Sequence, residues 1–147
     1  MAYENPYWYT TYSYELQDWG AGSDIDVELI GPPGLKGKIK EIQLNCTETF
    51  AGSTNTALNI GTAAGGAQNV AITIDAAGGD AFTAGDVYTV NCETAAANSI
   101  GAPGNSVVVT TDDLAADTAF YFGFQGGTGT LTAGIATVHV TVAWGHW

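Results

Sequence analysis

The chain of 147 residues is long enough for one domain with a buried core, since 46% of its residues are apolar and 11% are aromatic. Only 12% are charged, and three Lys, no Arg and 15 Asp plus Glu give a formal net charge of −12. Proteins hold nucleic acids and anionic membranes mainly through Lys and Arg, so this balance argues against both kinds of partner. The 20 glycines and the many Ala, Thr and Asn residues are typical of strands and tight turns.

Alternation of apolar and polar residues begins near the N-terminus. The pattern from Trp8 to Leu16 predicts a strand with Trp8, Tyr12, Tyr14 and Leu16 on one face. A second alternating run covers residues 25–29, and the Gly-Pro-Pro-Gly sequence after it predicts a turn.

The next alternating run begins at Lys36 and places Ile42, Leu44 and Cys46 on one face. Ile39 is out of phase with Ile42, which predicts a β-bulge or a strand start near Lys40.

The rest of the chain continues in short runs separated by Gly- and Ala-rich turns. Further strands are expected at residues 57–60, 70–74, 87–92, 107–110, 120–124 and 136–144. A loop is expected over 94–105, and one helical turn over 111–117. The whole pattern predicts an all-β fold, a two-sheet β-sandwich or jelly roll of about 8–10 antiparallel strands. We expect this single domain to span residues 10–147, with an aromatic N-terminal arm over residues 1–9.

The inventory of reactive side chains is small. The two histidines are His139, expected on an exposed strand face, and His146, close to the end of the sequence. A Ser–His–acid relay needs a base held between a nucleophile and a carboxylate, and a zinc site needs paired Cys or His ligands. We therefore expect no catalytic residue, no metal and no cofactor. Cys46 and Cys92 are interpreted as buried free thiols, with a disulfide between them as the alternative.

Two groups of acids carry the carboxylate oxygens that calcium prefers as ligands. One comprises Asp24, Asp26 and Glu28, and the other comprises Asp112, Asp113 and Asp117. Neither has the spacing of a calcium-binding loop, so both are interpreted as solvated acids on a strand and a turn.

Aromatic residues crowd the N-terminal stretch. One face of a strand can bury only about half of them, which leaves Tyr3, Tyr7 and Tyr9 over. Exposed aromatic side chains are favoured at protein interfaces, so we predict a partner contact at Tyr3, Tyr7, Trp8 and Tyr9. The alternative is that they cover the open end of the sandwich.

The three lysines of the chain lie close together. Lys36, Lys38 and Lys40 alternate, so they are expected to share one face of a strand. Like charges side by side are unfavourable, which predicts an acidic partner or nearby acids that offset them. The alternative is that they protect an edge strand against aggregation.

Several segments together resemble a known family. They are residues 37–44, 47–50, 57–61, 119–124 and the Thr-Ala-Gly-containing ending 129–140. In these segments, within a span of residues 36–144, the chain resembles the jelly-roll decoration, or cement, proteins on the capsids of tailed bacteriophages. The resemblance rests on strand and turn patterns, and the Tyr-rich arm lies outside it.

The resemblance implies a non-enzymatic virion protein that adds onto an assembled icosahedral shell, often as trimers, and clamps subunits of the major capsid protein. Its location would be the capsid exterior, after synthesis in the host cytoplasm. The N-terminus agrees with this, because it shows neither the basic region nor the apolar run of a signal peptide.

Two other functions remain as alternatives. One is a tail or fibre subunit. The other is a carbohydrate-binding module that stacks host glycans on Trp8, Trp19, Trp144 or Trp147.

Overall fold

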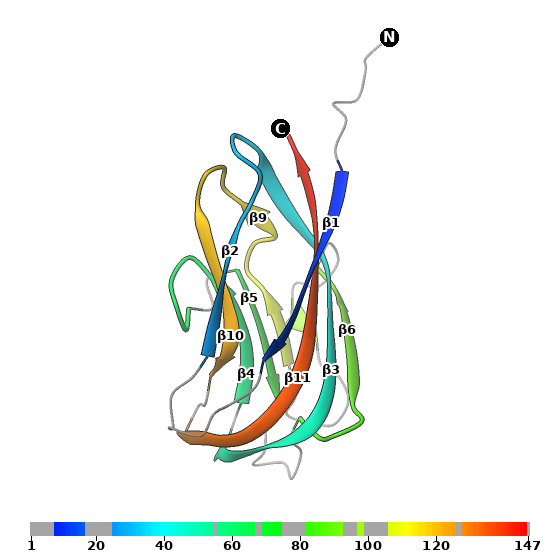
Figure 1. The fold of residues 1–147 in the computed structure, drawn as a ribbon, viewed down its shortest axis with the longest axis vertical. Helices are drawn as coiled ribbons and strands as arrows, with labels where there is room; N and C mark the ends of the chain where they lie inside the picture. The colour runs from blue at the N-terminus through cyan, green and yellow to red at the C-terminus, as the bar shows by residue number, and fades with distance from the viewer. Residues whose placement is uncertain are drawn as a thin grey trace.

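The computed structural model describes residues 8–16, 25–54, 56–66, 69–74, 82–92, 97–98, 106–125 and 128–146. These residues form two antiparallel sheets packed face to face, which confirms the predicted all-β sandwich (Figure 1). The strands are β1 (Trp8–Leu16), β2 (Ile25–Ile30), β3 (Lys36–Thr54), β4 (Thr56–Gly61), β5 (Val70–Ile74), β6 (Val87–Asn91), β7 (Ala97–Asn98), β8 (Ser106–Val109), β9 (Asp113–Leu114), β10 (Ala119–Gln125) and β11 (Thr128–Gly145). No described helix is long and apolar enough to cross a bilayer.

The strand order is that of a jelly roll. The first sheet has the order β1-β11-β3-β6, with β9 also pairing with β3, and the second has the order β2-β10-β4-β5-β8-β7. Early strands therefore lie beside late ones in both sheets, as two interlocked Greek keys require. This order brings β1 to one edge of the first sheet and β6 to the other.

The two longest strands, β3 and β11, pair along almost their whole length. Figure 1 shows both curving beneath the base of the sandwich, where their register shifts several times. A further shift lies at the other end, where Thr141 pairs with Glu41 but Val142 pairs with Ile39. Lys40 is thus the extra residue of a β-bulge, as the sequence predicts, and Ile39 and Ile42 are both buried because of it.

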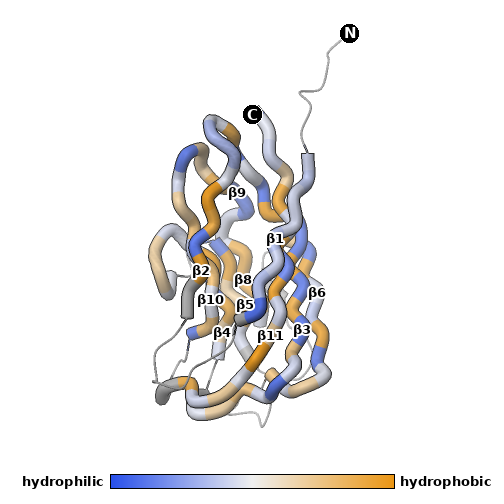
Figure 2. The backbone as a smooth tube through the Cα atoms, viewed as in Figure 1, coloured by the Kyte–Doolittle hydropathy of each residue, from blue (hydrophilic) through white to orange (hydrophobic). Residues whose placement is uncertain are grey.

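The core is closed at both ends by aromatic rings. At the end near the described C-terminus, the Trp144 ring is 1% exposed and packs against Gly31, after β2, and Gly37, in β3. At the opposite end Phe50, Phe82 and Phe124 contact one another, with ring centroids 4.5–5.5 Å apart. Figure 2 shows hydrophobic and hydrophilic residues alternating along β3, and the apolar Ile42, Leu44 and Cys46 of this strand are buried.

Two expectations need correction. The segment 111–117 is no helical turn, since it contains β9 and then a tight turn in which Asp117 has a φ of 52°. The backbone hydrogen-bonding groups of this segment are instead paired where β9 joins the start of β3. Trp8 and Tyr9, placed in the arm by the expected boundary, belong to β1 and pair with Trp144 and Ala143. The rest of the expected arm, and most of the loop over 94–105, lie outside the described residues.

The cysteines are buried free thiols, as predicted, and the strand register rules out a disulfide between them. The Cys46 N–H donates to the Asp86 carbonyl, while the Cys92 N–H donates to the Lys40 carbonyl. Lys40 and Cys46 lie about 20 Å apart along β3 at the usual rise per residue, whereas a disulfide needs Cα atoms within about 7 Å.

Gly37→Ala should lower the free energy of unfolding by about 1–3 kcal/mol in urea denaturation. A Cβ at Gly37 would lie 2.6 Å from Cζ3 of Trp144, so the ring must move. In a Trp144→Phe background, which lacks most of the clashing atoms, the same change should cost less. Gly34→Ala gives for comparison the cost of backbone strain without a clash, because Gly34 has a φ of 74° and an added Cβ there meets no atom within 4 Å, whereas Gly37 has no such φ. Equal costs of Gly37→Ala in both backgrounds would contradict this packing.

The folded protein should resist a thiol-specific reagent at about pH 8, and both thiols should react after denaturation. Burial raises the pKa of Cys46 and of Cys92 from 9.0 to about 12, so the folded chain retains two protons that the unfolded chain releases first. The free energy of unfolding should therefore fall as the pH rises above about 9. Replacing both cysteines by Ala should flatten that part of the profile, and an unchanged slope would argue against the thiols as its cause.

Candidate interaction surface

Strand β1 forms one edge of the first sheet. It pairs with β11 in unbroken register from Trp8↔Trp144 to Leu16↔Ala136, and no described strand pairs with its other side. Trp8 and Tyr9 are 48% and 58% exposed at the start of the strand. They are the two members of the predicted aromatic contact that the structure describes, and as consecutive residues of an edge strand they project from opposite faces of the sheet. Tyr3 and Tyr7 lie outside the described residues.

The inward face of β1 attaches the strand to the core. Tyr12 meets the Trp144 ring edge-on, with centroids 6.4 Å apart, and Tyr14 meets Phe122 of the opposite sheet at 5.2 Å. Trp8 shares their side of the strand, as the alternation predicts, but it stands at the end of the sandwich and remains half exposed. The aromatic residues of this strand are therefore divided between core packing and solvent.

The outward face of the first sheet is polar and carries few charges. Thr11 and Ser13 of β1 reach across to Thr141 and His139 of β11, with an Oγ1–Oγ1 distance of 3.0 Å and an Oγ–Nδ1 distance of 2.6 Å. The same face continues through β3 and β6 with Gln43, Asn45, Thr89 and Asn91. Such hydroxyl and amide groups suit contact with another polar surface.

Ser13 and His139 form a pair that the sequence gives no reason to expect, 126 residues apart. A nucleophile and base at this distance also need a third group that orients the base and donors for an oxyanion. Among the described residues no carboxylate hydrogen-bonds to His139, and the pair stands on an open sheet face. We therefore interpret it as a cross-strand link. No group of three His, Cys, Asp or Glu side chains in the described chain is placed to hold a metal ion.

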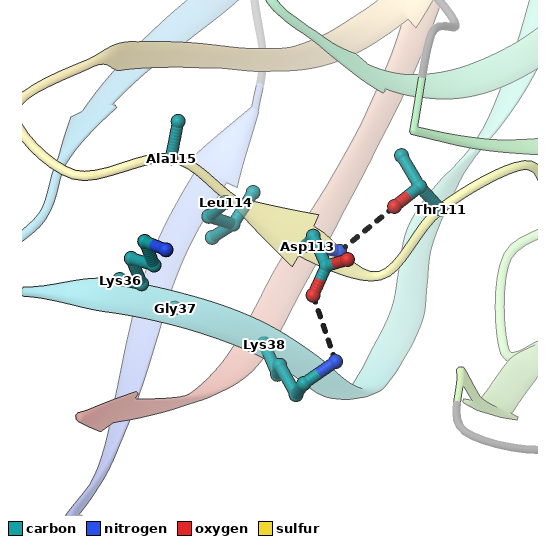
Figure 3. Close-up of a pocket in the computed structure, with 7 residues that line it drawn as sticks. All are labelled: Lys36, Gly37, Lys38, Thr111, Asp113, Leu114 and Ala115. Atoms are coloured by element: carbon teal, nitrogen blue, oxygen red, sulfur yellow. Dashed lines mark hydrogen bonds and ion pairs between the residues drawn. The ribbon is translucent and has the colours of Figure 1, made fainter. Parts of the chain in front are cut away.

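The lysines begin β3, beside a shallow depression of about 510 Å³ (Figure 3). Lys38 Nζ lies 2.7 Å from Asp113 Oδ1 and 3.7 Å from Asp112 Oδ1. The hydrogen bond to Asp113 raises the pKa of Lys38. Its charge is thus offset within the chain, as one of the sequence-based alternatives proposes. The side chain of Lys36 is exposed, and Lys40 stands at the bulge.

The edge-protection explanation for the lysines is wrong. At Gly37 and Lys38, β3 pairs with β11 on one side and with β9 on the other. An interior strand has no free edge to protect.

A buried amide holds the acids opposite the lysines. The Asn69 side chain is buried, and its Nδ2 donates to the Asp113 carbonyl at 3.0 Å, while the backbone carbonyl of Asn69 accepts from Thr110 N at 2.8 Å. Asp117, from the same acidic group, accepts a hydrogen bond from the Gly34 N–H at 2.8 Å. These acids therefore serve structural contacts. The sequence offers no signal for the role of Asn69, which sits in a loop without periodicity.

The tryptophans constrain the glycan alternative. Trp144 is fully buried and cannot stack on a sugar, because its ring is part of the core. Trp19 and Trp147 lie outside the described residues, so Trp8 is the described candidate.

Comparison with known proteins supplies no assignment. The sequence matches no family model and no curated protein.

Asn69→Ala should lower the free energy of unfolding by about 1–3 kcal/mol, because it removes the buried amide that bonds the Asp113 carbonyl. Lys38→Gln should cost less than about 1 kcal/mol, because the ion pair is largely exposed to water. Parallel urea melts compare the two, and 1 M salt should reduce only the effect of Lys38→Gln. A larger cost for Lys38→Gln would make the ion pair the main support of this segment.

Proposed function

We propose that this protein is a non-enzymatic virion structural protein that decorates and stabilises the outer surface of a bacteriophage capsid. The observation that carries the proposal is the exposed pair Trp8 and Tyr9 at the start of an edge strand, next to further aromatics in the sequence. Large aromatic side chains dominate binding energy at protein interfaces. The jelly-roll strand order and the resemblance to decoration proteins support the same function.

In this proposal the protein binds the major capsid protein on the capsid exterior. It also associates with itself, as members of the resembled family do when they form trimers. A protein that binds only the assembled lattice stabilises that lattice by mass action, and many copies brace it through multivalent contacts. A net charge of −12 suits a position outside the shell, since the packed genome is itself an anion. Synthesis in the host cytoplasm completes the proposed location.

The two alternatives use the same surface. A tail or fibre subunit would also assemble through exposed aromatics, and would differ in copy number. A glycan-binding module would stack a sugar on Trp8, or on Tyr9 beside the hydrogen-bonding groups of the polar outward face. Trp144 is no part of that alternative.

Quantitative mass spectrometry of gradient-purified particles tests the proposal first. We expect a ratio near one copy per major shell subunit. A few to dozens of copies per particle would favour the tail, and absence from particles would contradict every virion assignment. In that case quenching of Trp fluorescence by sugars, lost in Trp8→Ala, would support the glycan alternative.

Trp8→Ala with Tyr9→Ala should weaken binding to shells at least tenfold, because truncating even one aromatic interface hot spot typically costs about 2 kcal/mol or more, and about 1.4 kcal/mol is a tenfold change in affinity. Val87→Ala is the matched control, since Val87 is 61% exposed at the opposite edge of the same sheet. Deletion of residues 1–7 tests Tyr3 and Tyr7 while leaving β1 intact.

The lysine contact is tested with Lys36→Gln, which should weaken binding at low salt if the shell presents acids there. Unchanged binding in all of these variants would contradict the proposed surface.

A further inference from the structure

The β1 edge lacks the features that normally block strand pairing. Natural edge strands are kept short or carry Pro, Lys, inward charges or bulges. β1 has nine residues, no Pro, no Lys and an unbroken register with β11. The other edges differ: β6 has five residues, β7 has two, and β2 has six that include Asp26 and Glu28. β1 is therefore the described edge best suited to accept another strand.

We propose that two copies of this chain join through β1, antiparallel about a two-fold axis at Tyr12, and form one continuous sheet. The register of greatest overlap places Thr11 opposite Ser13 of the second copy, and Tyr9 opposite Glu15. The joined sheet runs from β6 of one copy to β6 of the other. Because a two-fold contact uses the same surface on both copies, the assembly closes as a dimer.

The side chains of β1 are complementary to β1 itself. Its one charged residue, Glu15, lies near one end, so the overlap register brings no two carboxylates opposite each other. The exposed Thr11 and Ser13 form the centre of the outward row, where paired hydroxyls are favourable across strands. Tyr12 meets its own copy on the inward side, where aromatic pairs are favourable. This self-complementarity favours a second copy over an unrelated strand.

The inference goes beyond the proposed function and does not depend on it. It also differs from the trimer that the resemblance implies, because edge pairing about a two-fold axis stops at two copies. A dimer that fails to bind shells would contradict only the proposed function. A monomer that binds shells would contradict the present inference and the proposed self-association, and would leave the proposed shell binding intact.

Electrostatics gives this dimer a defined salt dependence. Each copy carries a net charge of −12, so association brings like charges together and salt screens their repulsion. Sedimentation velocity over a protein concentration series should show a monomer–dimer equilibrium whose dimer fraction rises several-fold between 0.02 and 0.5 M NaCl. A monomer at every concentration and salt level, or a trimer, would overturn the proposal.

Disulfide trapping tests the register itself. In a mixture of Thr11→Cys and Ser13→Cys proteins under mild oxidation, the two new thiols lie directly opposite and within disulfide reach. The native cysteines are buried and contribute little background. We expect the mixed disulfide dimer, identified by mass, to form at least several-fold faster than the dimer of either variant alone. Thr89→Cys, exposed on the same face at the β6 edge, is the matched control. Cross-linking no faster than that of Thr89→Cys would overturn the proposal.

Discussion

The fold depends on the packing of the Trp144 indole ring against the backbone of two glycines, Gly31 and Gly37. Gly31 leaves β2 in one sheet and Gly37 lies in β3 of the other, so Trp144 of β11 contacts both layers at once. A Cβ added at either glycine would clash with atoms of the ring. Since Tyr12 packs edge-on against the same ring, the position of β1 also depends on it. Burying a ring of this size typically contributes several kcal/mol, a large part of a domain's net stability.

At the opposite end of the sandwich, the core is closed by the bending of the two long strands. β3 and β11 continue past the sheet and curve beneath it, and Gly134, with a φ of 138°, lies where Phe50 packs against the backbone. Only glycine adopts such a φ without strain, and its missing Cβ leaves the space that the Phe50 ring occupies. Phe50 then completes the contact with Phe82 and Phe124. The two long strands are thus fixed at both ends, and the β-bulge at Lys40 keeps their apolar residues in phase between those ends.

Alternation was enough to predict the sandwich, the inward positions of Tyr12 and Leu44, and the bulge, because each depends on local periodicity. Alternation did not predict the features that depend on pairing between strands far apart in the sequence. The expected helical turn over 111–117 is β9, held by the start of β3 and by the buried Asn69 amide. The edge-protection reading of the lysines failed for the same reason, since no local pattern shows that β9 covers that part of β3. The Ser13–His139 pair depends on β1 and β11 becoming neighbours, which only the jelly-roll order specifies.

The jelly-roll order also explains why β1 combines a fixed position with an available edge. Its inward tyrosines join the core through Trp144 and Phe122, and its outward hydroxyls join β11 through Thr141 and His139. These contacts order the strand in the unbound chain. Binding a partner would therefore not carry the entropic cost of ordering it. Strand addition at such an edge gains main-chain hydrogen bonds, while exposed side chains set the choice of partner. The two-fold contact uses the main chain along the edge of this strand, whereas the exposed side chains of Trp8 and Tyr9 project from the two faces of the sheet. Self-pairing and shell binding are therefore compatible on one strand.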